Sequence, residues 1–304
     1  MATVIDGNAL AEELRAGIEE ELAVLRLSAV RPGLATVLVG SDYAAEAYES
    51  HLRKLSEGLE YRFVSEHLAE TASIDDVLAA LGKVNADPRV TGILVLRPLP
   101  SHLPESEVNA AIDPFKDIEA VSPLNAGLLA EGRPRFIPST PASCFFALDS
   151  HVRSRGHDPR TFCAGRTLVV VGRSLSVGKP AQWLGQQRDA TVVACHSRTR
   201  NLAEFTRQAD VLIVSTGVPG LVTADMVRDG VIAIDVGINA VKDHSTGKTR
   251  LVGDLDFDGV AARAEAITPV PGGIGPITDV WLVGNVLAAA AMAARVEPRF
   301  GLFH

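Results

Sequence analysis

The chain has 304 residues, of which 47% are hydrophobic and 22% are charged, as is typical of soluble globular proteins. This length is sufficient for one large domain or for two of ordinary size. The formal net charge is −8 and no run of lysine and arginine reaches five residues. We therefore expect no nucleic-acid-binding surface.

Targeting and metal-binding signals are absent from the sequence. No apolar run approaches the ~20 residues of a membrane span, and the start, MATVIDGNALAEEL, has neither the basic region nor the apolar core of a signal peptide. Three cysteines, Cys144, Cys163 and Cys195, are widely spaced, which indicates neither a disulfide framework nor a zinc site. We expect a cytoplasmic protein with no membrane partner and no metal.

Strand-like apolar runs alternate with helical patterns in the first half of the chain, which favours parallel α/β structure. The patterns predict helices over 7–26, 43–58 and 74–86, and strands over 34–40, 61–67 and 91–96. Residues 97–140 are rich in proline and are expected to be mainly loop. A helix over 141–155 should follow, with Thr140 as its cap and Pro141 at its first position.

The alternation begins again in the second half. Strands are predicted over 166–171, 190–195, 210–215 and 230–236, helices over 178–187, 201–208, 223–228 and 276–295, and a hairpin-like piece over 240–252. These patterns predict a two-lobed α/β protein. Its first lobe covers 1–140 and is joined by the C-terminal helix 276–304, and its second, Rossmann-like lobe covers 141–275. A ligand is expected in a cleft between the lobes, at the carboxyl ends of strands.

The stretch VVVGRSLSVGKP, residues 169–180, is a candidate phosphate-binding turn. A Walker A loop needs four residues between its glycines and a hydroxyl after the lysine; here five residues separate Gly172 from Gly178, and Pro180 replaces the hydroxyl residue. The dinucleotide pattern GxGxxG also fails, because Ser174 stands at its second glycine. Its context is nevertheless present, since a strand enters the turn and a helix leaves it. This context favours a dinucleotide over an ordinary polar loop.

The next predicted strand ends at His196, Ser197, Arg198 and Thr199. In dinucleotide-binding folds this position recognises the adenosine ribose, and an acid there would bind the 2′-hydroxyl of NAD. Serine and arginine stand here instead, and arginine suits a 2′-phosphate. The sequence therefore favours NADP over NAD.

Several segments carry a resemblance to a known family. In chain order they read GSDYAAEAY (40–48), GILVLRPLP (92–100), PFKDIEAVSPLNAG (114–127), FIPSTP (136–141), VGRSLSVGKP (171–180), CHSRT (195–199), ADVLIVSTG (209–217), GVIAIDVGIN (230–239), LVGDLDF (251–257) and TPVPGGIGPIT (268–278). Together they resemble the methylenetetrahydrofolate dehydrogenase/cyclohydrolase family, across nearly the whole chain. The PVPGGIGPIT and DVGIN segments are highly specific in that context.

This resemblance implies a two-lobed homodimer that oxidises 5,10-methylenetetrahydrofolate to the methenyl cation with NADP⁺, or sometimes NAD⁺. Most members then hydrolyse the methenyl group to 10-formyltetrahydrofolate. Carried over by position, the cofactor-binding residues would be Gly172, Arg173, Ser174, Val177, Ser197, Arg198, Thr216, Gly217, Gly237, Ile238 and Thr278. The folate-binding residues would be Tyr48, Leu96, Arg97, Glu119, Pro271, Gly272, Gly273, Ile274 and Gly275.

The sequence departs from the family pattern in the folate lobe. The family has a tyrosine followed by a lysine four residues later; Tyr48 is present, but Leu52 replaces the lysine. The strand motif VQLPLP reads VLRPLP, so that Leu96 replaces the glutamine. The motif KDVDG reads KDIEA, so that Glu119 replaces an aspartate and Ala120 a glycine. Tyr48, Leu52, Leu96 and Glu119 thus occupy the catalytic positions.

Neighbouring polar residues are not expected to substitute for the missing ones. On a helix, residue i+4 returns to the face of residue i, whereas i+6 lies about 120° away, so Lys54 does not replace the lysine, and Arg53 also points elsewhere. On a strand, successive side chains point to opposite faces, which separates Arg97 from Leu96. We interpret Asp117 as a structural acid, and His51 as a solvated helix residue.

These departures have a chemical consequence. Hydride loss needs positioning of the substrate against the nicotinamide, whereas hydrolysis needs a group that takes a proton from water. Leu52 and Leu96 cannot transfer protons, so the sequence predicts a dehydrogenase that has lost cyclohydrolase activity. Three alternatives stay open: an oxidoreductase of this fold for a modified folate or other substrate, a non-catalytic folate- or nucleotide-binding protein, and a bifunctional enzyme with a different proton carrier.

Overall fold

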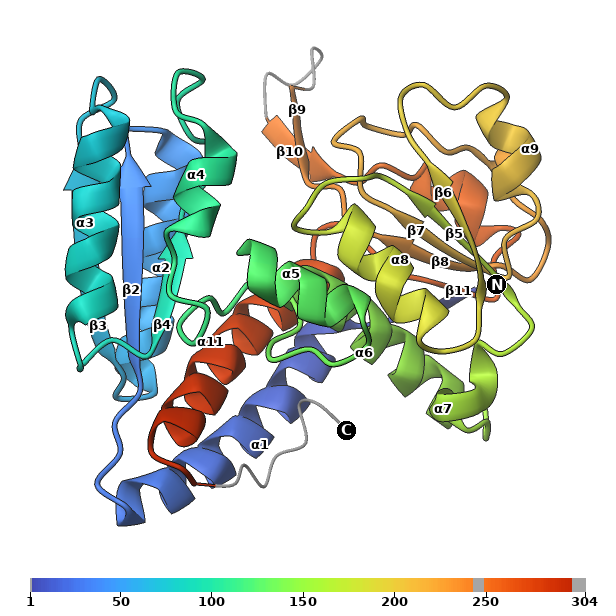
Figure 1. The fold of residues 1–304 in the computed structure, drawn as a ribbon. Coiled ribbons are helices and arrows are strands. Elements are labelled where there is room, and N and C mark those ends of the chain that lie inside the picture. Colours follow the sequence, from blue (N-terminus) through green and yellow to red (C-terminus); the bar gives the residue numbers. More distant parts are fainter. Residues whose placement is uncertain (1, 243–248, 297–304) are drawn as a thin grey trace. The chain divides into compact units, whose positions relative to one another are not determined.

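The computed structural model describes residues 2–242 and 249–296, which form two compact units (Figure 1). Unit 1 contains Met1–Glu13 and Ser139–Thr278, and unit 2 contains Leu14–Pro138 and the chain from Asp279 onward. Both units are α/β structures with parallel sheets, which confirms the predicted class. The prediction assigned residues 1–140 to one lobe, whereas the structure assigns the first thirteen residues to unit 1. They belong there because β1 (Thr3–Val4), a strand too short to predict, pairs with the unit 1 sheet.

Unit 1 has a six-stranded parallel sheet in the order β1-β11-β8-β7-β5-β6. Its further strands are β5 (Thr167–Val171), β6 (Thr191–Cys195), β7 (Val211–Val214), β8 (Ile232–Asp235) and β11 (Ala266–Ile267). Strands β5, β7 and β8 are almost entirely buried, as expected for the central strands of a parallel sheet covered on both faces. Since β6 and β7 lie on opposite sides of β5, the strand order reverses at β5.

Helices and short elements connect these strands. They are α6 (Ser139–Ser154), α7 (Pro159–Phe162), α8 (Gly178–Gln186), α9 (Leu202–Thr206), the 3₁₀ helix η1 (Ala224–Met226) and α10 (Phe257–Ala261). The predicted hairpin is confirmed as β9 (Asn239–Lys242) antiparallel to β10 (Thr249–Val252); residues 243–248 between them lie outside the described part. The predicted helix over 223–228 is wrong, since this segment forms only η1.

Unit 2 has a three-stranded parallel sheet in the order β3-β2-β4. The strands are β2 (Gly33–Val39), β3 (Arg62–Leu68) and β4 (Gly92–Val95), and the helices within the unit are α2 (Tyr43–Gly58), α3 (Ile74–Ala86), α4 (Glu105–Ala110) and α5 (Pro123–Ala130). Two long helices, α1 (Gly7–Leu27) and α11 (Ile274–Ala293), have residues in both units. The helix predicted over 276–295 is α11, which ends at Ala293. Of the C-terminal segment that was predicted to extend to residue 304, residues 297–304 lie outside the described part.

The central strand β2 packs against a helix on each face. Val37 belongs to a buried cluster that includes Val77 and Leu81 of α3, whereas Leu38 belongs to one with Ala45 of α2. This alternation follows from the two-residue period of a strand, and every residue of β2 is buried. Helix α2, which carries Tyr48, is therefore held directly on a rigid sheet.

The helices begin where the sequence supplies caps. The side chain of Asp42 accepts a hydrogen bond from the Ala45 amide at 2.9 Å at the start of α2, and Ser73 and Asp76 form a capping box at the start of α3. The loop-rich prediction for 97–140 overlooked α4 and α5. Two of its prolines, Pro104 and Pro123, stand at the N-cap and first position of these helices, where proline is tolerated because no N–H is needed.

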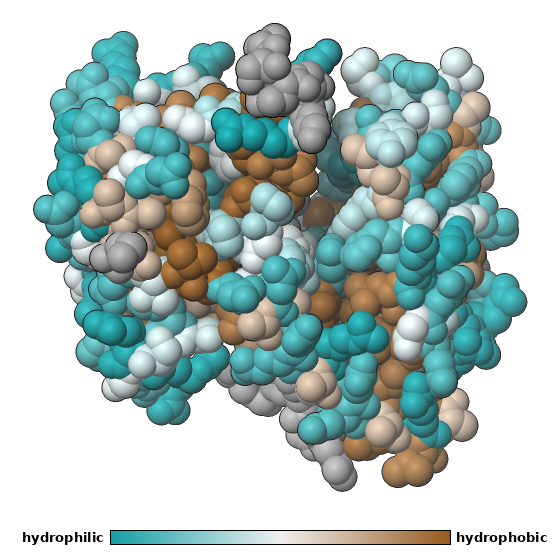
Figure 2. Space-filling model, turned by 180° about the vertical axis from the view of Figure 1, so that it is seen from behind, coloured by the Kyte–Doolittle hydropathy of each residue, from teal (hydrophilic) through white to brown (hydrophobic). Residues whose placement is uncertain are grey.

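Helix α11 qualifies the expectation that no segment resembles a membrane span. By length and composition it is the one described helix that could cross a membrane, but 78% of its apolar window is buried inside the protein. Figure 2 shows a face of the molecule that is mostly hydrophilic, interrupted by hydrophobic patches. The burial of α11 fits the core helix of a soluble protein.

Candidate active site

The turn after β5 is built from glycines that tolerate very close backbone contacts. Gly172 has φ +146°, and a Cβ atom on it would lie 2.5 Å from the Ser215 carbonyl oxygen; a Cβ on Gly178 would lie 2.4 Å from the Gly172 carbonyl oxygen. Ser215 follows β7, so the turn lies where the strand order reverses. In α/β proteins this is the point at which ligands bind, and a backbone without side chains lets a pyrophosphate approach closely.

Ser174, at the second glycine position of the dinucleotide pattern, closes this turn. Its Oγ accepts hydrogen bonds from the amides of Val177 at 3.1 Å and Gly178 at 3.2 Å, and its carbonyl accepts from the Lys179 amide at 3.0 Å. The serine thereby satisfies backbone donors at the start of α8, which a glycine could not do. Its hydroxyl hydrogen has no acceptor among the described residues and is available to a phosphate oxygen.

The segment after β6 forms a tight turn that presents Ser197 and Arg198. The Thr199 Oγ1 accepts from the His196 amide at 2.9 Å, and His196 Nδ1 accepts from the Arg198 amide at 3.1 Å. Ser197 and Arg198 are exposed, as is Arg173 on the neighbouring turn. Neither arginine forms an ion pair with a residue that the structure describes, so both guanidinium groups are free to meet an anion.

Asp254 joins the loops that follow β7 and β10. Its Oδ2 accepts from the Thr216 amide at 2.5 Å, the Thr216 hydroxyl at 2.9 Å and the Gly217 amide at 3.0 Å, while its Oδ1 accepts from Asn239 Nδ2 at 2.9 Å. A Cβ on Gly237 would lie 2.1 Å from this carboxylate. The structure thus brings together the predicted cofactor residues Thr216, Gly217 and Gly237 around an anchor that the resemblance did not supply.

Asp235 extends this hydrogen-bond network, because it accepts a hydrogen bond from the backbone amide of Asp254. Its carboxylate accepts from the amides of Gly237 and Asp254, both at 3.0 Å, and from that of Leu255 at 2.8 Å. Burial raises the pKa of Asp235 to about 6, against the opposing effect of these backbone hydrogen bonds. The two acids are structural, and among the described residues no cluster of histidine, cysteine and acids could hold a metal ion.

Exposed apolar side chains surround the same edge of the unit 1 sheet. Leu175 follows β5, Val218 follows β7 and Ile238 follows β8, and their exposed fractions are 46%, 47% and 60%. A group of exposed apolar side chains at the carboxyl ends of three adjacent strands is unfavourable in water and indicates a surface that a ligand covers. They suit the flat rings of a dinucleotide.

The PGGIG segment is shaped by its contacts with the start of α1. The Gly7 amide donates to the Gly272 carbonyl at 2.9 Å, and a Cβ on Gly7 would lie 1.7 Å from the Gly273 carbonyl oxygen. Pro271 is exposed and Ile274 is buried, while Thr278 donates its hydroxyl to the Ile274 carbonyl at 3.1 Å. Of these predicted residues, Pro271 and Gly272 are accessible to a ligand, whereas Gly273 and Ile274 shape the backbone.

In unit 2, the leucines at the expected catalytic positions are both buried. Leu96 is 3% exposed and clusters with Leu38 and Ala45, with Tyr48 packed against them. Leu52, one helical turn after Tyr48 on the unbroken α2, is fully buried. Nothing in these two side chains can take or give a proton.

Asp279 of α11 is a charged neighbour of Tyr48 that sequence reasoning missed. Its charge acts on the phenol, and His51 Nε2 lies 2.9 Å from Asp279 Oδ2. His51 is an exposed residue of α2, as predicted, with 54% of its side chain exposed, and it also contacts Asp279. Its i+3 spacing from Tyr48 was a usable signal, whereas nothing local could indicate an aspartate 228 residues further along the chain.

The charges around this pair are mainly negative. Burial, followed by the charges of Asp279 and Glu119, raises the pKa of Tyr48 well above its usual value. Burial also raises the pKa of Asp279, against the opposing effects of His51 and Tyr48. Tyr48 is therefore a neutral phenol throughout the physiological range of pH.

The KDIEA segment holds Glu119 through its neighbours. Asp117 is fully buried and accepts from the amides of Val121 at 3.0 Å and Ser122 at 2.8 Å, and Asn285 Nδ2 of α11 donates to the Ile118 carbonyl at 2.7 Å. This is the structural role predicted for Asp117. Ala120 has φ +49°, a left-handed conformation that favours glycine and so explains the glycine of the family motif.

The remaining candidates for a replacement base are engaged elsewhere. Arg97, which follows the end of β4, contacts Asn109 and lies 3.2 Å from Glu105 of α4. Arg53 Nη2 donates to Ser65 at 2.6 Å, and Lys54 is exposed. The assignment of Arg97 to the folate site stays a prediction.

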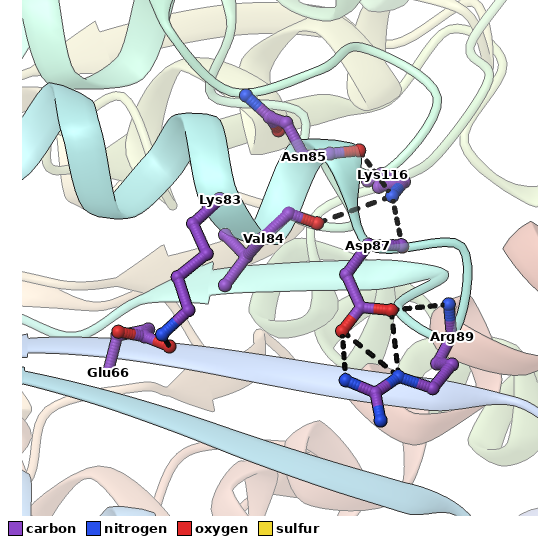
Figure 3. Close-up of polar contacts among 7 residues, drawn as sticks. All are labelled: Glu66, Lys83, Val84, Asn85, Asp87, Arg89 and Lys116. Atoms are coloured by element: carbon purple, nitrogen blue, oxygen red, sulfur yellow. Dashed lines mark hydrogen bonds and ion pairs between the residues drawn. The ribbon is translucent and has the colours of Figure 1, made fainter.

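Lys116 belongs to the KDIEA segment but works as a helix cap (Figure 3). Its Nζ donates to the carbonyls of Val84 at 3.3 Å, Asn85 at 2.6 Å and Asp87 at 2.9 Å, at the end of α3. These three contacts use all the donors of an ammonium group. A lysine held this way stabilises the helix terminus and is not a base.

The substitution Lys116→Met tests this assignment. We expect the free energy of unfolding to fall by about 1–2 kcal/mol, because charge-assisted hydrogen bonds to α3 are lost. Urea titration followed by circular dichroism measures this loss. Decay of methenyltetrahydrofolate should not change, and a change there in folded protein would contradict the structural assignment.

Comparison with known proteins agrees with this geometry. Residues 5–119 match the family model of the tetrahydrofolate dehydrogenase/cyclohydrolase catalytic domain, and residues 138–294 that of the NAD(P)-binding domain of the same family. The chain is 55% identical over 303 residues to Bifunctional protein FolD 3 of Rubrobacter xylanophilus, covering 98% of this chain and 95% of the relative.

Two solved structures are also similar. The Campylobacter jejuni bifunctional FolD enzyme has a TM-score of 0.88 at 34% identity, over 96% of this chain and 100% of that one. The Trypanosoma brucei enzyme, complexed with NADP cofactor and inhibitor, has a TM-score of 0.88 at 33% identity, over 97% and 99%. Fold, site residues and similarity thus lead to one conclusion: the chain belongs to the tetrahydrofolate dehydrogenase/cyclohydrolase family.

Proposed function

We propose that this protein oxidises 5,10-methylenetetrahydrofolate to 5,10-methenyltetrahydrofolate with NADP⁺ and does not hydrolyse the product. The observation that carries this proposal is a contrast between the two units. Unit 1 has the close glycine turn and the exposed arginines that a dinucleotide site requires. Unit 2 has buried leucines at the two positions where the resemblance implies residues that take part in proton transfer.

The residues of unit 1 fit a bound dinucleotide. The backbone of Gly172 and the Ser174 hydroxyl would hold its phosphates, and the loops anchored by Asp254 would hold its nicotinamide end. When bound, NADP⁺ accepts the hydride from the substrate. The similar structure that contains NADP supports this assignment.

Hydride loss makes few demands on the protein beyond position. A nitrogen lone pair of the substrate drives the C–H electron pair out, so no side chain needs to move a proton. Under this proposal, Tyr48 and Glu119 would contact the folate, and the buried Leu52 and Leu96 would add no polar group to its surroundings. Apolar surroundings would also disfavour water as a competing nucleophile.

Hydrolysis requires a group that takes a proton from the attacking water. Leu52 and Leu96 offer none, and Lys54, Arg97 and Lys116 lie exposed or engaged elsewhere. Asp279 lies in contact with His51. Position 52, to which the resemblance assigns the lysine, holds a leucine and therefore offers no base.

Two absorbance assays on purified protein test the proposal. We expect NADPH to form from methylenetetrahydrofolate at an enzymatic rate, and methenyltetrahydrofolate to decay only at its rate in buffer. Decay well above that background would contradict the predicted loss of hydrolysis. Absence of NADPH formation would contradict the dehydrogenase itself.

Cofactor preference gives a separate prediction. Replacing Arg198 with alanine should weaken NADP binding by roughly 10- to 150-fold, because a charge-assisted contact with the 2′-phosphate is worth ~1.5–3 kcal/mol. NAD affinity, measured by the same fluorescence titration, should stay unchanged and serves as the control. Equal binding of NAD and NADP by the unmodified protein would contradict this assignment.

A second candidate is an oxidoreductase for a modified folate. Glu119 favours it, because one extra methylene relative to aspartate moves a carboxylate by roughly 1 Å, enough to matter in catalysis. Under this alternative, a set of folates with altered pterin rings should include one that is oxidised much faster than methylenetetrahydrofolate. A binding protein without turnover would bind folate and NADP but form no NADPH with any of them.

The resemblance also implies a homodimer in the cytoplasm, and we include both in the proposal. Light scattering of the purified protein should give a mass of about twice that of one chain. A monomeric mass under the conditions of the activity assay would contradict the proposed assembly.

A further inference from the structure

We propose that unit 1 carries a second binding site, for a small phosphate anion, in a cavity lined by Arg155, Arg166 and Arg228. The cavity has a volume of about 210 Å³. It is smaller than the ~300–1,000 Å³ pockets that hold drug-sized ligands, so its ligand is inorganic phosphate or a small phosphate monoester. The site does not depend on which reaction the protein catalyses.

The cavity lies at the edge of the unit 1 sheet where the strands begin. Arg166, Asp210 and Glu265 directly precede β5, β7 and β11, and Ile232 is the first residue of β8. All four line the cavity. The Gly172 turn follows the last residue of β5 and so lies at the opposite edge of the sheet. A ligand in this cavity is therefore separate from the proposed dinucleotide.

The two acids that line the cavity are already paired. Asp210 Oδ1 accepts a hydrogen bond from Arg228 Nη1 at 2.5 Å. Glu265 Oε1 lies 3.1 Å from His151 Nε2 and 3.7 Å from Arg155 Nε. The negative charge of each acid is thereby opposed by an arginine of the same wall.

Arg166 is the cation that these pairs leave over. Its guanidinium carbon lies 4.0 Å from the centroid of the Phe162 ring, and its Nη1 donates to the Phe162 carbonyl. Its other N–H groups have no hydrogen-bond or ion-pair partner among the residues that the structure describes. The ring and the carbonyl hold the guanidinium in place, so little side-chain freedom is lost when an anion binds.

Two histidines add polar groups to the same wall. His151 is buried, and its Nδ1 has no hydrogen-bond partner within the described part of the chain. His157 is exposed, and its ring centroid lies 6.1 Å from that of Phe162. Buried polar atoms are normally hydrogen-bonded. The wall is thus polar and incompletely hydrogen-bonded, which favours a polar ligand over an apolar one.

Three guanidinium groups on one small cavity favour phosphate over a carboxylate. Arginine presents its N–H groups in a rigid fork that fits the oxygens of either anion. A carboxylate has two oxygens, which a single arginine can engage as a bidentate pair, whereas a phosphate has enough oxygens and charge for several arginines. Arg155 and Arg228 are 59% and 49% exposed, so their remaining donors are accessible.

Isothermal titration calorimetry with inorganic phosphate, at constant ionic strength, tests the site directly. Arg166→Met keeps an unbranched stem beside Phe162 but removes the charge, and it should weaken phosphate binding by at least ~10-fold, because a charge-assisted hydrogen bond is lost. Arg160→Met is the matched control, since Arg160 is exposed, pairs with Asp158 at 2.9 Å and does not line the cavity. It should leave the affinity unchanged. Equal affinities of Arg166→Met and the unmodified protein would overturn the proposal.

A change of the opposite sign separates the effect of charge from damage to the wall. Glu265→Gln removes a negative charge from the cavity and should strengthen phosphate binding several-fold, because less repulsion opposes the anion. Weaker binding by this variant would contradict the electrostatic basis of the site. Should Arg166→Met fail to fold, Arg155→Met removes an exposed side chain instead, and unchanged affinity in that variant would overturn the site.

Glycerol 3-phosphate, titrated in the same way, distinguishes the two sources of the phosphate group. Tighter binding than that of inorganic phosphate would assign the site to a monoester, and weaker binding would assign it to the free ion. Binding of neither probe would overturn the proposal.

Arg198→Ala distinguishes this cavity from the proposed dinucleotide site. We expect phosphate binding to persist in this variant, because Arg198 does not line the cavity. Loss of binding in Arg198→Ala but not in Arg166→Met would place the anion in the dinucleotide site and overturn the proposal. Dehydrogenase turnover in the absence of phosphate should be equal in Arg166→Met and the unmodified protein. Absence of turnover in both, with phosphate binding intact, would contradict the proposed function and leave the anion site supported.

Discussion

The triple substitution Leu52→Lys, Leu96→Gln and Glu119→Asp is expected to create hydrolysis of methenyltetrahydrofolate at least ~100-fold above the buffer rate, the lower limit of typical general acid–base catalysis. Leu52 is fully buried, and burial lowers the pKa of a lysine by disfavouring its charged form. The neighbouring carboxylates oppose this shift. The rate should therefore rise with pH as the lysine loses its proton.

The intermediate variants show which residues act together. Either leucine replaced alone should have little effect, because an unpartnered polar group in this pocket costs ~1–3 kcal/mol. Leu52→Lys with Leu96→Gln should hydrolyse some substrate, and adding Glu119→Asp should increase the rate by returning the pterin to its position in the family. Dehydrogenase turnover of each variant is the control for folding. If the triple variant still oxidises folate but methenyl decay stays at background, the pocket is built for a different substrate.

Replacing Asp254 with alanine should lower the free energy of unfolding by about 3–5 kcal/mol. The carboxylate is fully buried and accepts hydrogen bonds from Thr216, Gly217 and Asn239. Removing it leaves buried donors unpaired, at about 1–3 kcal/mol each. Because Thr216 and Gly217 line the proposed nicotinamide side, NADP binding should weaken together with stability.

Asp256 provides a matched control two residues away. It is exposed, and its side chain forms no capping hydrogen bond with α10. Asp256→Ala should change the free energy of unfolding by less than about 0.5 kcal/mol. Urea titrations of both variants measure the difference. Similar losses for the two would mean that Asp254 is not the anchor of these loops.

Local patterns predicted the elements that position the site. Helix α2, with Tyr48 and Leu52 one turn apart, and the strand–turn–helix around Gly172 lie where periodicity and glycine spacing indicated. The register of a continuous helix is a local property, so Leu52 could be assigned to the lysine position from sequence alone. The alternation expected for Leu96 and Arg97 assumed a strand over 91–96, whereas β4 ends at Val95, just before both residues.

Contacts between distant segments were not predictable in this way. Two-residue strands such as β1 have no periodicity to detect, yet β1 brings the first residues into unit 1. The cap on α3 comes from Lys116, 29 residues beyond Asp87. Likewise, Asp254 carries no local sign that it anchors Thr216, 38 residues away.

The sequence by itself determined the α/β class, the family and the absence of a lysine and a glutamine from the folate pocket, because each of these is written in short, continuous motifs. Only the tertiary structure decided what surrounds Tyr48. Asp279 follows the glycine-rich segment near the C-terminal end of the described chain, and it contacts His51 because α11 and α2 belong to the same unit. Charges act through space, so the raised pKa of Tyr48 depends partly on Asp279 and Glu119, which lie far from it in the sequence.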